Sequence, residues 1–184
     1  MKTILIPVAK GFEEIEAVSL IDILRRAEIK VIVASLENNL EVQGAHNVTI
    51  IADTDIQNIT TKDIDMILLP GGWGGTKLLA QDKHVQNLLK EMNNKNKDIA
   101  AICAAPYALN SAGVLPQNYT CYPSVEEEIR IEGYQANEKI VEDGNIITSR
   151  GPGTAMCLAF YIVKKYKGEE MYNSLKSGLL VDFC

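Results

Sequence analysis

Short apolar runs alternate along this chain with longer segments in which apolar residues have a helical spacing. An apolar run bounded by turn residues predicts a buried strand, and apolar residues three or four positions apart predict an amphipathic helix. The predicted strands span residues 3–9, 30–36, 64–69 and 99–102. The predicted helices span residues 12–27, 85–92, 154–166 (with Thr154 as N-cap) and 169–177.

Two further segments carry weaker alternating signals that predict β-hairpins. Residues 40–51 have Gly44 near their middle, and residues 140–148 contain the turn pair Asp143-Gly144. Because strands separated by helices form parallel sheets covered on both faces, the pattern predicts an α/β fold. There is no repeat, linker or low-complexity segment, so we expect residues 1–184 to form one domain.

Composition and charge narrow the classes of function. Of the 184 residues, 47% are hydrophobic, which suits a globular domain that buries about 70% of its unfolded surface. The formal net charge is −6, and no basic cluster is longer than Lys164-Lys165, which argues against a nucleic-acid-binding surface. The apolar N-terminal stretch contains Pro7 and stops at Lys10, so it is too short for a signal peptide or a membrane span. We therefore expect a cytoplasmic protein.

The cysteines and histidines give no metal-site pattern. Cys103, Cys121, Cys157 and Cys184 show no C-x-x-C spacing, and the chain has only two histidines. A zinc site or a disulfide framework is therefore not expected. In a reducing compartment the four cysteines should be free thiols, with Cys184 exposed at the chain end.

Cys103 is the strongest candidate for chemistry. It follows the predicted strand 99–102 and precedes small residues that predict the start of a helix. Ala101 and Ala105, two positions before and after it, permit the sharp turn on which serine hydrolases place their nucleophile. A helix N-terminus also stabilises a thiolate and lowers the pKa of cysteine. The alternative is an inert buried thiol, because free cysteine commonly behaves as a small hydrophobic residue.

Three predicted strands end in unusual residues, and ligands of parallel sheets bind at the carboxyl ends of the strands. The first ends before a glutamate-rich helix start, the third before Pro70-Gly71-Gly72, and the fourth before Cys103. The backbone N–H groups of Gly71, Gly72 and Ala104 are candidates to bind the oxyanion that forms when a thiolate attacks a carbonyl. The alternative is a plain glycine-rich turn between a strand and a helix.

The partner of the thiol is left open by the sequence pattern. Glu13, Glu14 and Glu16 open the first predicted helix, where the helix dipole favours carboxylates without any function. A glutamate on the buried face would have a raised pKa suited to proton transfer, but spacing does not choose among the three. Neither His46 nor His84 is placed to form a Cys-His pair, which disfavours a papain-like mechanism.

Arg150 begins a segment, Arg150-Gly151-Pro152-Gly153-Thr154, that leads a strand into a helix. Such a turn at a helix N-terminus is able to bind an anion. The alternative is a rigid corner with a capping threonine.

Five segments together resemble the ThiJ/PfpI superfamily, in the branch of the Parkinsonism-associated protein deglycase and its bacterial relatives. They lie in the family's order and span nearly the whole chain. The matching segments are residues 9–16, 24–31, 68–72, 100–106 and 148–154.

The resemblance implies a flavodoxin-like three-layer sandwich, a homodimer and a chemistry that needs no cofactor or metal. It also implies that Cys103 is readily oxidised to a sulfinate, that Glu16 contacts its sulfur, and that Gly72 and Ala104 supply the oxyanion amides. Members of this branch are described as deglycases of protein or nucleotide, as cofactor-independent glyoxalases and as redox-responsive chaperones.

Three positions depart from the family pattern. Ala104 stands where protease members have a histidine, which argues against peptidase activity. Tyr122 replaces a histidine that precedes a proline near the site, and His46 aligns with an arginine that approaches the cysteine across the dimer in some relatives.

The expected function is an enzyme in which Cys103 attacks a small reactive carbonyl or a glycation adduct. Glu16 would move the proton, and Tyr122 and Arg150 would support the site. The alternative is a redox sensor or chaperone whose signal is the oxidation of Cys103.

Overall fold

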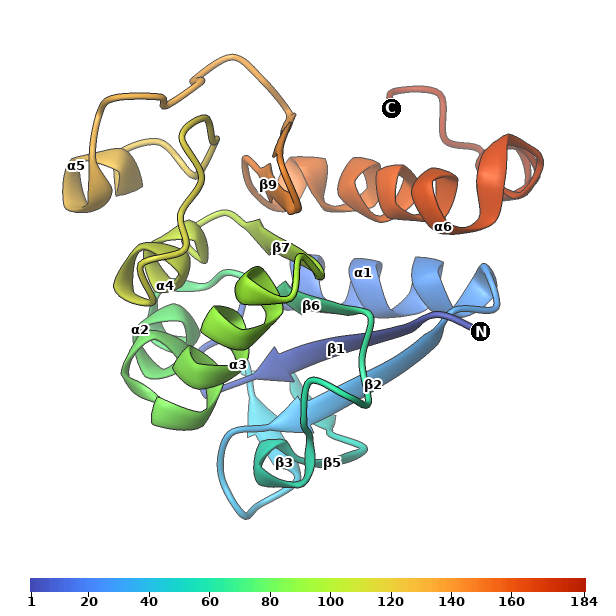
Figure 1. Ribbon diagram of the computed structural model, residues 1–184. Coiled ribbons are helices and arrows are strands. Elements are labelled where there is room, and N and C mark those ends of the chain that lie inside the picture. The colour runs from blue at the N-terminus through green and yellow to red at the C-terminus, as the bar shows by residue number, and fades with distance from the viewer.

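The computed structural model describes all 184 residues and confirms the α/β fold (Figure 1). A seven-stranded sheet has the order β5-β2-β1-β6-β7-β9-β8, in which only β8 runs antiparallel to its neighbour. A separate antiparallel hairpin pairs β3 with β4, so both predicted hairpins are confirmed. The strands are β1 (Thr3–Val8), β2 (Lys30–Ser35), β3 (Glu41–Gln43), β4 (Thr49–Ile51), β5 (Thr54–Asp55), β6 (Met66–Leu69), β7 (Asp98–Ile102), β8 (Ile140–Asp143) and β9 (Ile146–Ser149).

Helices cover both faces of this sheet. In Figure 1, α1 and α6 lie side by side on one face, and α2, α3 and α4 lie together away from them. Short 3-10 turns span Ile56–Asn58 and Pro152–Thr154. The helices are α1 (Glu14–Arg26), α2 (Trp73–Gln81), α3 (Lys83–Asn94), α4 (Pro106–Ser111), α5 (Val125–Ile129) and α6 (Ala155–Gly178).

The alternation of side chains along the strands divides the core into two layers. On β1, Ile4 and Ile6 are fully buried in the layer that holds α1 and α6. Leu5, between them, is buried in the opposite layer with Leu89 of α3 and Leu109 of α4. Because successive residues of a strand point to opposite faces, one apolar run fills both layers.

Two short helices are absent from the sequence prediction. The start of α2 contains Gly74-Gly75, which reads as a turn in sequence. Glycine at position 75 leaves room for the backbone before α1, because a Cβ there would lie only 3.0 Å from the backbone nitrogen of Phe12. The glycine therefore allows α2 to pack closely on the segment before α1. The other missed helix, α5, has only five residues.

The C-terminal helices are predicted correctly as two segments. The run from Ala155 to Gly178 is broken at Gly168, whose φ of 84° is not helical. Thr154 stands at the N-cap position of α6, but its hydroxyl bonds to Ser149 and Gly151 instead of capping the helix.

The expectation of four free thiols is wrong for one pair. Cys157 and Cys184 form a disulfide, and only Cys103 and Cys121 are free. The chain after α6 folds back along that helix, which brings the two Cα atoms to 5.1 Å. The spacing of the cysteines in the sequence does not show where the C-terminal residues lie in space, so this pairing could not be predicted from it. No helix of the fold combines the length and the apolar character that a membrane crossing requires.

The sheet order places the predicted site. Strands β1, β6 and β7 are adjacent, so their carboxyl ends, with the unusual residues that follow them, meet at one edge of the sheet. In Figure 1 the arrowhead of β1 points toward the side of the molecule on which α2 and α4 lie.

Candidate active site

Cys103 lies on a sharp turn directly after β7. Its φ is +65°, a left-handed conformation that non-glycine residues adopt mainly where the surrounding structure imposes it. The Cys103 N–H donates to the carbonyl of Ser149 over 2.9 Å, and its carbonyl accepts the N–H of Tyr122 over 2.9 Å. Ala101 and Ala105 are completely buried, as the tight turn requires. Hydrogen bonds to the neighbouring strand β9 and to the segment before α5 therefore hold the turn at Cys103 in place.

Glu16 on the first turn of α1 is the carboxyl group beside the thiol. Its side chain is 0% exposed, and Oε2 accepts the N–H of Gly71 over 2.7 Å. The other oxygen, Oε1, is buried and accepts no N–H or O–H donor. Burial raises the pKa of Glu16 to about 7, against the opposing effect of hydrogen bonds with Cys103 and Gly71. The structure thus singles out one of the three glutamates, and Oε1 is the oxygen left to carry a proton.

The electrostatics of the thiol differ from the prediction. Burial raises the pKa of Cys103, and an ionised Glu16 raises that pKa further, while the N–H groups of Gly72 and Ala104 lower it. The predicted lowering by a helix N-terminus is therefore outweighed by burial and by the neighbouring Glu16. Two adjacent groups that repel when both are charged titrate as a pair. At neutral pH the Cys103–Glu16 pair keeps a proton, and a proton on Glu16 removes the repulsion that disfavours the thiolate.

The predicted oxyanion donors separate into two kinds. The N–H groups of Gly72 and Ala104 contact the Cys103 sulfur. The N–H of Gly71 instead donates to Oε2 of Glu16, and its role as an oxyanion donor stays a prediction. Gly72 has a φ of +86°, and a Cβ there would lie 2.4 Å from the carbonyl oxygen of Gly11. Only glycine fits this position, so the backbone can approach the sulfur.

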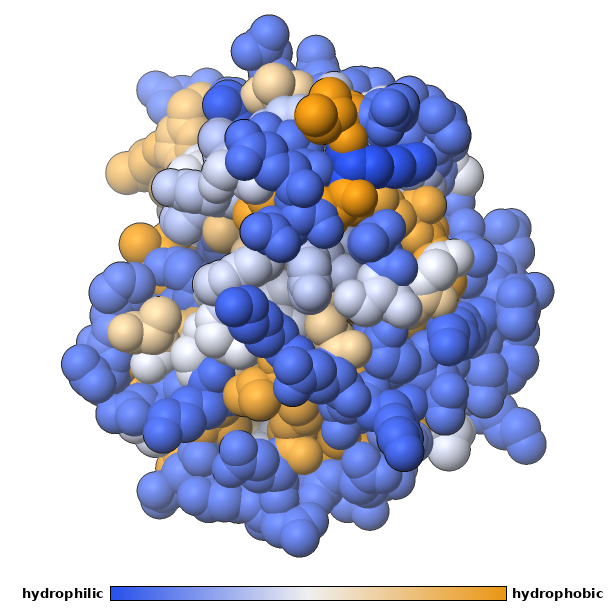
Figure 2. Space-filling model, turned by 90° about the vertical axis from the view of Figure 1, so that its left-hand side faces the viewer, coloured by the Kyte–Doolittle hydropathy of each residue, from blue (hydrophilic) through white to orange (hydrophobic).

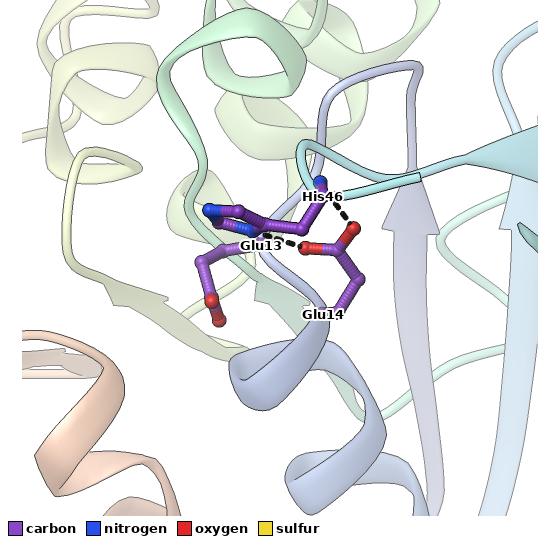
Figure 3. Close-up of side chains that lie close together, drawn as sticks. All are labelled: Glu13, Glu14 and His46. Atoms are coloured by element: carbon purple, nitrogen blue, oxygen red, sulfur yellow. Dashed lines mark hydrogen bonds and ion pairs between the residues drawn. The ribbon is translucent and has the colours of Figure 1, made fainter. Parts of the chain in front are cut away.

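The two remaining glutamates serve the backbone and a histidine. The carboxylate of Glu13 caps α1 by accepting the N–H of Glu16 over 2.7 Å. Glu14 points to His46, whose ring Nδ1 lies 2.9 Å from Glu14 Oε2 (Figure 3). Despite burial, which acts in the other direction, hydrogen bonds from His46 and Val48 lower the pKa of Glu14.

Glu13, Glu14 and His46 are also the one group of potential metal ligands in the chain that lie close together. Their oxygen and nitrogen atoms lie within 4.8 Å of one another. Each already has a protein partner: Glu14 and His46 pair with one another, and Glu13 holds a helix N-terminus. The geometry therefore gives these residues structural roles.

A cavity of about 550 Å³ opens over the thiol. Cys103, Gly72, Ala104 and Tyr122, four of the site residues expected from sequence, line it. Arg150 does not, although it follows β9; its N–H donates to the carbonyl of Lys139. The predicted supporting role of Arg150 thus finds no direct contact with the cavity.

Several other lining residues are not candidates from sequence, and Trp73, Glu127 and Glu128 are the aromatic and charged ones among them. His46, for which no catalytic role is expected from sequence, lines the cavity as well. Trp73 is the first residue of α2, the helix that Gly74-Gly75 made hard to predict. The two glutamates belong to the acidic run Glu126–Glu128 in α5, which the sequence did not predict either. The acidic run lies just after Tyr122-Pro123, a pair expected from sequence to lie near the site. This closeness in sequence is the signal that could have identified the two glutamates as cavity residues.

Residues 2–165 match the DJ-1/PfpI family. The chain belongs to the DJ-1/PfpI family. It is 38% identical to protein dj-1beta of Drosophila melanogaster over 184 residues, which cover 99% of this chain and 98% of that protein. The crystal structure of Drosophila melanogaster DJ-1beta superposes with a TM-score of 0.95 over 99% of both chains.

Other DJ-1 relatives differ in length and in name. The chain is 38% identical to protein DJ-1 homolog A of Arabidopsis thaliana over 97% of its own length but only 46% of that protein, so it spans about half of this plant relative. It is 34% identical over 91% of its length to the glutathione-independent glyoxalase DJR-1.2 of Caenorhabditis elegans, and covers 89% of that protein. Membership of the DJ-1 branch and its fold, both expected from the resemblance, are thereby confirmed.

Proposed function

We propose that this DJ-1/PfpI chain is a cysteine-dependent enzyme that acts on reactive carbonyls. Its reaction is that of a cofactor-independent glyoxalase, a deglycase of early glycation adducts, or both. The observation that carries this proposal is the buried Glu16 carboxyl, with its pKa raised to about 7, beside a thiol that two backbone N–H groups contact. The name of the Caenorhabditis elegans relative supports the glyoxalase form.

The first step is addition of the Cys103 thiolate to the aldehyde carbon of an α-oxoaldehyde. A carbon–sulfur bond forms, and the π electrons of the carbonyl move to its oxygen. That oxygen takes the proton of Glu16, which gives a hemithioacetal. The N–H groups of Gly72 and Ala104, which contact the sulfur, are the donors available to the developing oxyanion.

The second step is an internal transfer of two electrons. Glu16, now a carboxylate, removes the proton from the hemithioacetal carbon and returns a proton to the neighbouring ketone carbon. The hydroxyl proton of the hemithioacetal passes to the ketone oxygen. The first carbon is oxidised to a thioester and the second is reduced to an alcohol, so no outside oxidant is needed. Water then hydrolyses the thioester, which releases a 2-hydroxy acid and restores the thiol. A pKa near 7 suits Glu16 to both directions of this transfer.

Lactate formation from methylglyoxal tests the proposal. We expect lactate above the buffer blank for the wild type, and rates at the blank for Cys103→Ser and Glu16→Gln. Cys121→Ser is the matched control, because Cys121 is a free buried cysteine that does not line the cavity. The proposal that the chain is an enzyme is overturned if the wild type makes no more lactate than the buffer blank, or if Cys103→Ser makes lactate at the wild-type rate.

A redox sensor or chaperone is the second candidate, and one observation favours it. Cys103 is 8% exposed at the floor of an open cavity, and the N–H groups that contact its sulfur would also stabilise the oxygens of a sulfinate. Stoichiometric oxidation of Cys103 by peroxide, measured by mass spectrometry in a protein without lactate turnover, would favour this candidate.

We also propose that the chain forms a homodimer through an apolar surface of α1 and the β3–β4 hairpin. Ile15 and Val18 of α1 are 60% and 47% exposed, and Val48 and Ile51 of the hairpin are 51% and 73% exposed. Val18 and Ile51 line one shallow groove, so the two elements form a continuous surface. A second copy of the chain would bury these side chains.

The cytoplasmic location, inferred from the N-terminal stretch, and the lack of a nucleic-acid partner, inferred from charge, stay predictions from the sequence. The acidic net charge of −6 supports the second of them.

A further inference from the structure

The cavity over Cys103 is lined by negative charge. Three carboxylates, those of Glu13, Glu127 and Glu128, line it, and no lysine or arginine does. Its one basic residue, His46, is paired with Glu14 over 2.9 Å, so the charge of a protonated imidazole is already balanced. The lining therefore presents a net negative field to anything that approaches the thiol.

The two glutamates of α5 are not neutralised by neighbours. Glu127 and Glu128 are both exposed, and neither forms an ion pair within the chain. Seen from the side on which α2, α4 and α5 lie, the molecular surface is mainly hydrophilic, with small and separate hydrophobic patches (Figure 2). The surface around the cavity therefore offers no large apolar patch at this end of the molecule.

Aromatic rings complete a lining suited to cations. Trp73 and Tyr122 are 38% and 49% exposed in the cavity wall. The ammonium nitrogen of Lys77 already lies 5.0 Å from the Trp73 ring centroid, so Tyr122 is the ring of the lining that has no cation of the chain over it. An aromatic face attracts a cation through its quadrupole, and carboxylates next to it add to that attraction.

We propose that this cavity selects carbonyl compounds that carry a positive charge, accepts neutral ones and excludes anionic ones such as 2-oxo acids and phosphorylated carbonyls. The reaction that follows binding rests on the proposed function. The charge selection belongs to the lining, so it acts on any reagent that reaches the Cys103 sulfur.

Two methanethiosulfonate reagents of opposite charge measure this selection without turnover. In each case the Cys103 sulfur attacks the reagent's thiol-derived sulfur, forms a mixed disulfide, releases methanesulfinate and loses its proton to solvent. Second-order rate constants for the trimethylammonium and the sulfonate reagent are measured by mass spectrometry and divided by their rates with 2-mercaptoethanol. Cys121 is fully buried, and a Cys103→Ser protein shows whether any other site reacts.

The decisive comparison removes only the charges of α5. In Glu127→Gln/Glu128→Gln, we expect the cation-to-anion rate ratio to fall by about tenfold at 10 mM salt. The two carboxylates line the same cavity as the sulfur, act with opposite sign on the two reagents and are little screened at this salt concentration. In 1 M salt the wild-type ratio should fall to that of the variant. Glu28→Gln/Glu170→Gln, which removes two exposed carboxylates elsewhere, should keep the wild-type ratio.

Two results overturn the inference. One is a wild-type ratio at or below that of 2-mercaptoethanol, and the other is an unchanged ratio in the α5 variant. Lactate assays of the same proteins keep the two proposals apart. A wild type that shows the charge preference but makes no lactate refutes the glyoxalase reaction and leaves the selection standing. A wild type that makes lactate but shows no charge preference refutes the charge selection and leaves the glyoxalase reaction standing.

Discussion

The backbone N–H of Gly71 donates to Oε2 of Glu16 over 2.7 Å, which joins the end of β6 to the first turn of α1. This bond fixes one oxygen of the carboxyl group and leaves the other, Oε1, without an N–H or O–H donor. A Cβ at position 71 would lie 2.6 Å from both Glu16 Oε2 and Cys103 Cβ. The glycine therefore allows the carboxyl and the thiol to approach each other.

Gly71→Ala should separate the pair. The added methyl group has no space between Glu16 and Cys103, so one of them must move. We expect lactate turnover to fall by about a hundredfold, as for a misplacement of roughly 1 Å in an active site, with a stability loss of about 1–3 kcal/mol. Turnover and urea unfolding measure the two effects.

Gly74→Ala is the control for that variant. A Cβ at position 74 would have only ordinary contacts, the nearest at 3.4 Å, and position 74 lies in α2. We expect its stability to be equal or higher by up to about 1 kcal/mol, with wild-type turnover. Equal turnover in both alanine variants would contradict the role given to Gly71.

Stability should fall as the pH rises through the pKa of Glu16. Burial raises that pKa from 4.5 to about 7, so between these values the folded protein holds a proton that the unfolded chain has lost. The contribution is fully present below pH 4.5 and is lost as the pH passes 7, with a magnitude of roughly 3 kcal/mol. Glu16→Gln, which stays neutral, should lack this loss.

Urea unfolding at pH 5 and pH 8 makes this comparison. Glu14, whose pKa is lowered, contributes the opposite dependence, but it is present in both proteins and cancels in the difference. Parallel losses of stability in wild type and Glu16→Gln between the two pH values would refute the raised pKa.

Reduction of the Cys157–Cys184 disulfide should destabilise the protein. The bond closes a loop between residues 27 positions apart, for which chain entropy predicts a contribution of about 2–4 kcal/mol. Dithiothreitol should lower the melting temperature of the wild type. Cys184→Ser should melt at the lower temperature with or without the reductant. A wild type insensitive to the reductant would show that this bond contributes nothing to stability.

Ile51→Asp should prevent dimer formation. Ile51 is 73% exposed on the apolar surface of α1 and the β3–β4 hairpin, and a buried carboxylate without a partner is costly. Light scattering after size exclusion should give a dimer for the wild type and a monomer for the variant. Ile131→Asp, which changes an isoleucine that is 71% exposed elsewhere, should remain dimeric. A monomeric wild type would refute the proposed homodimer.

The sequence supports prediction of the sheet better than of its short helices. Strands β1, β6 and β7 are recognisable in the sequence as apolar runs, because strands buried on both faces have few polar positions. α2 is hidden because Gly74-Gly75 has low helix propensity, and that helix is set by close packing against the segment before α1. With α2 and α5 unpredicted, Trp73 and the glutamates of the cavity were missed as well.

By itself the sequence determined the α/β architecture, the residues that follow three of the strands and the position of Cys103 between small residues, because these follow from local periodicity and side-chain size. Only the tertiary structure decided that the three strand ends meet, because this depends on the order β1-β6-β7 in the sheet. Resemblance to a family pointed to Glu16, but only the tertiary structure shows that it is the glutamate buried beside the thiol. Folding also assigned the Gly71 N–H to Glu16, closed the Cys157–Cys184 bond and gathered negative charge around the cavity. Each of these depends on the approach of segments far apart in the chain, and the shift in the pKa of Glu16 follows from the burial that this approach creates.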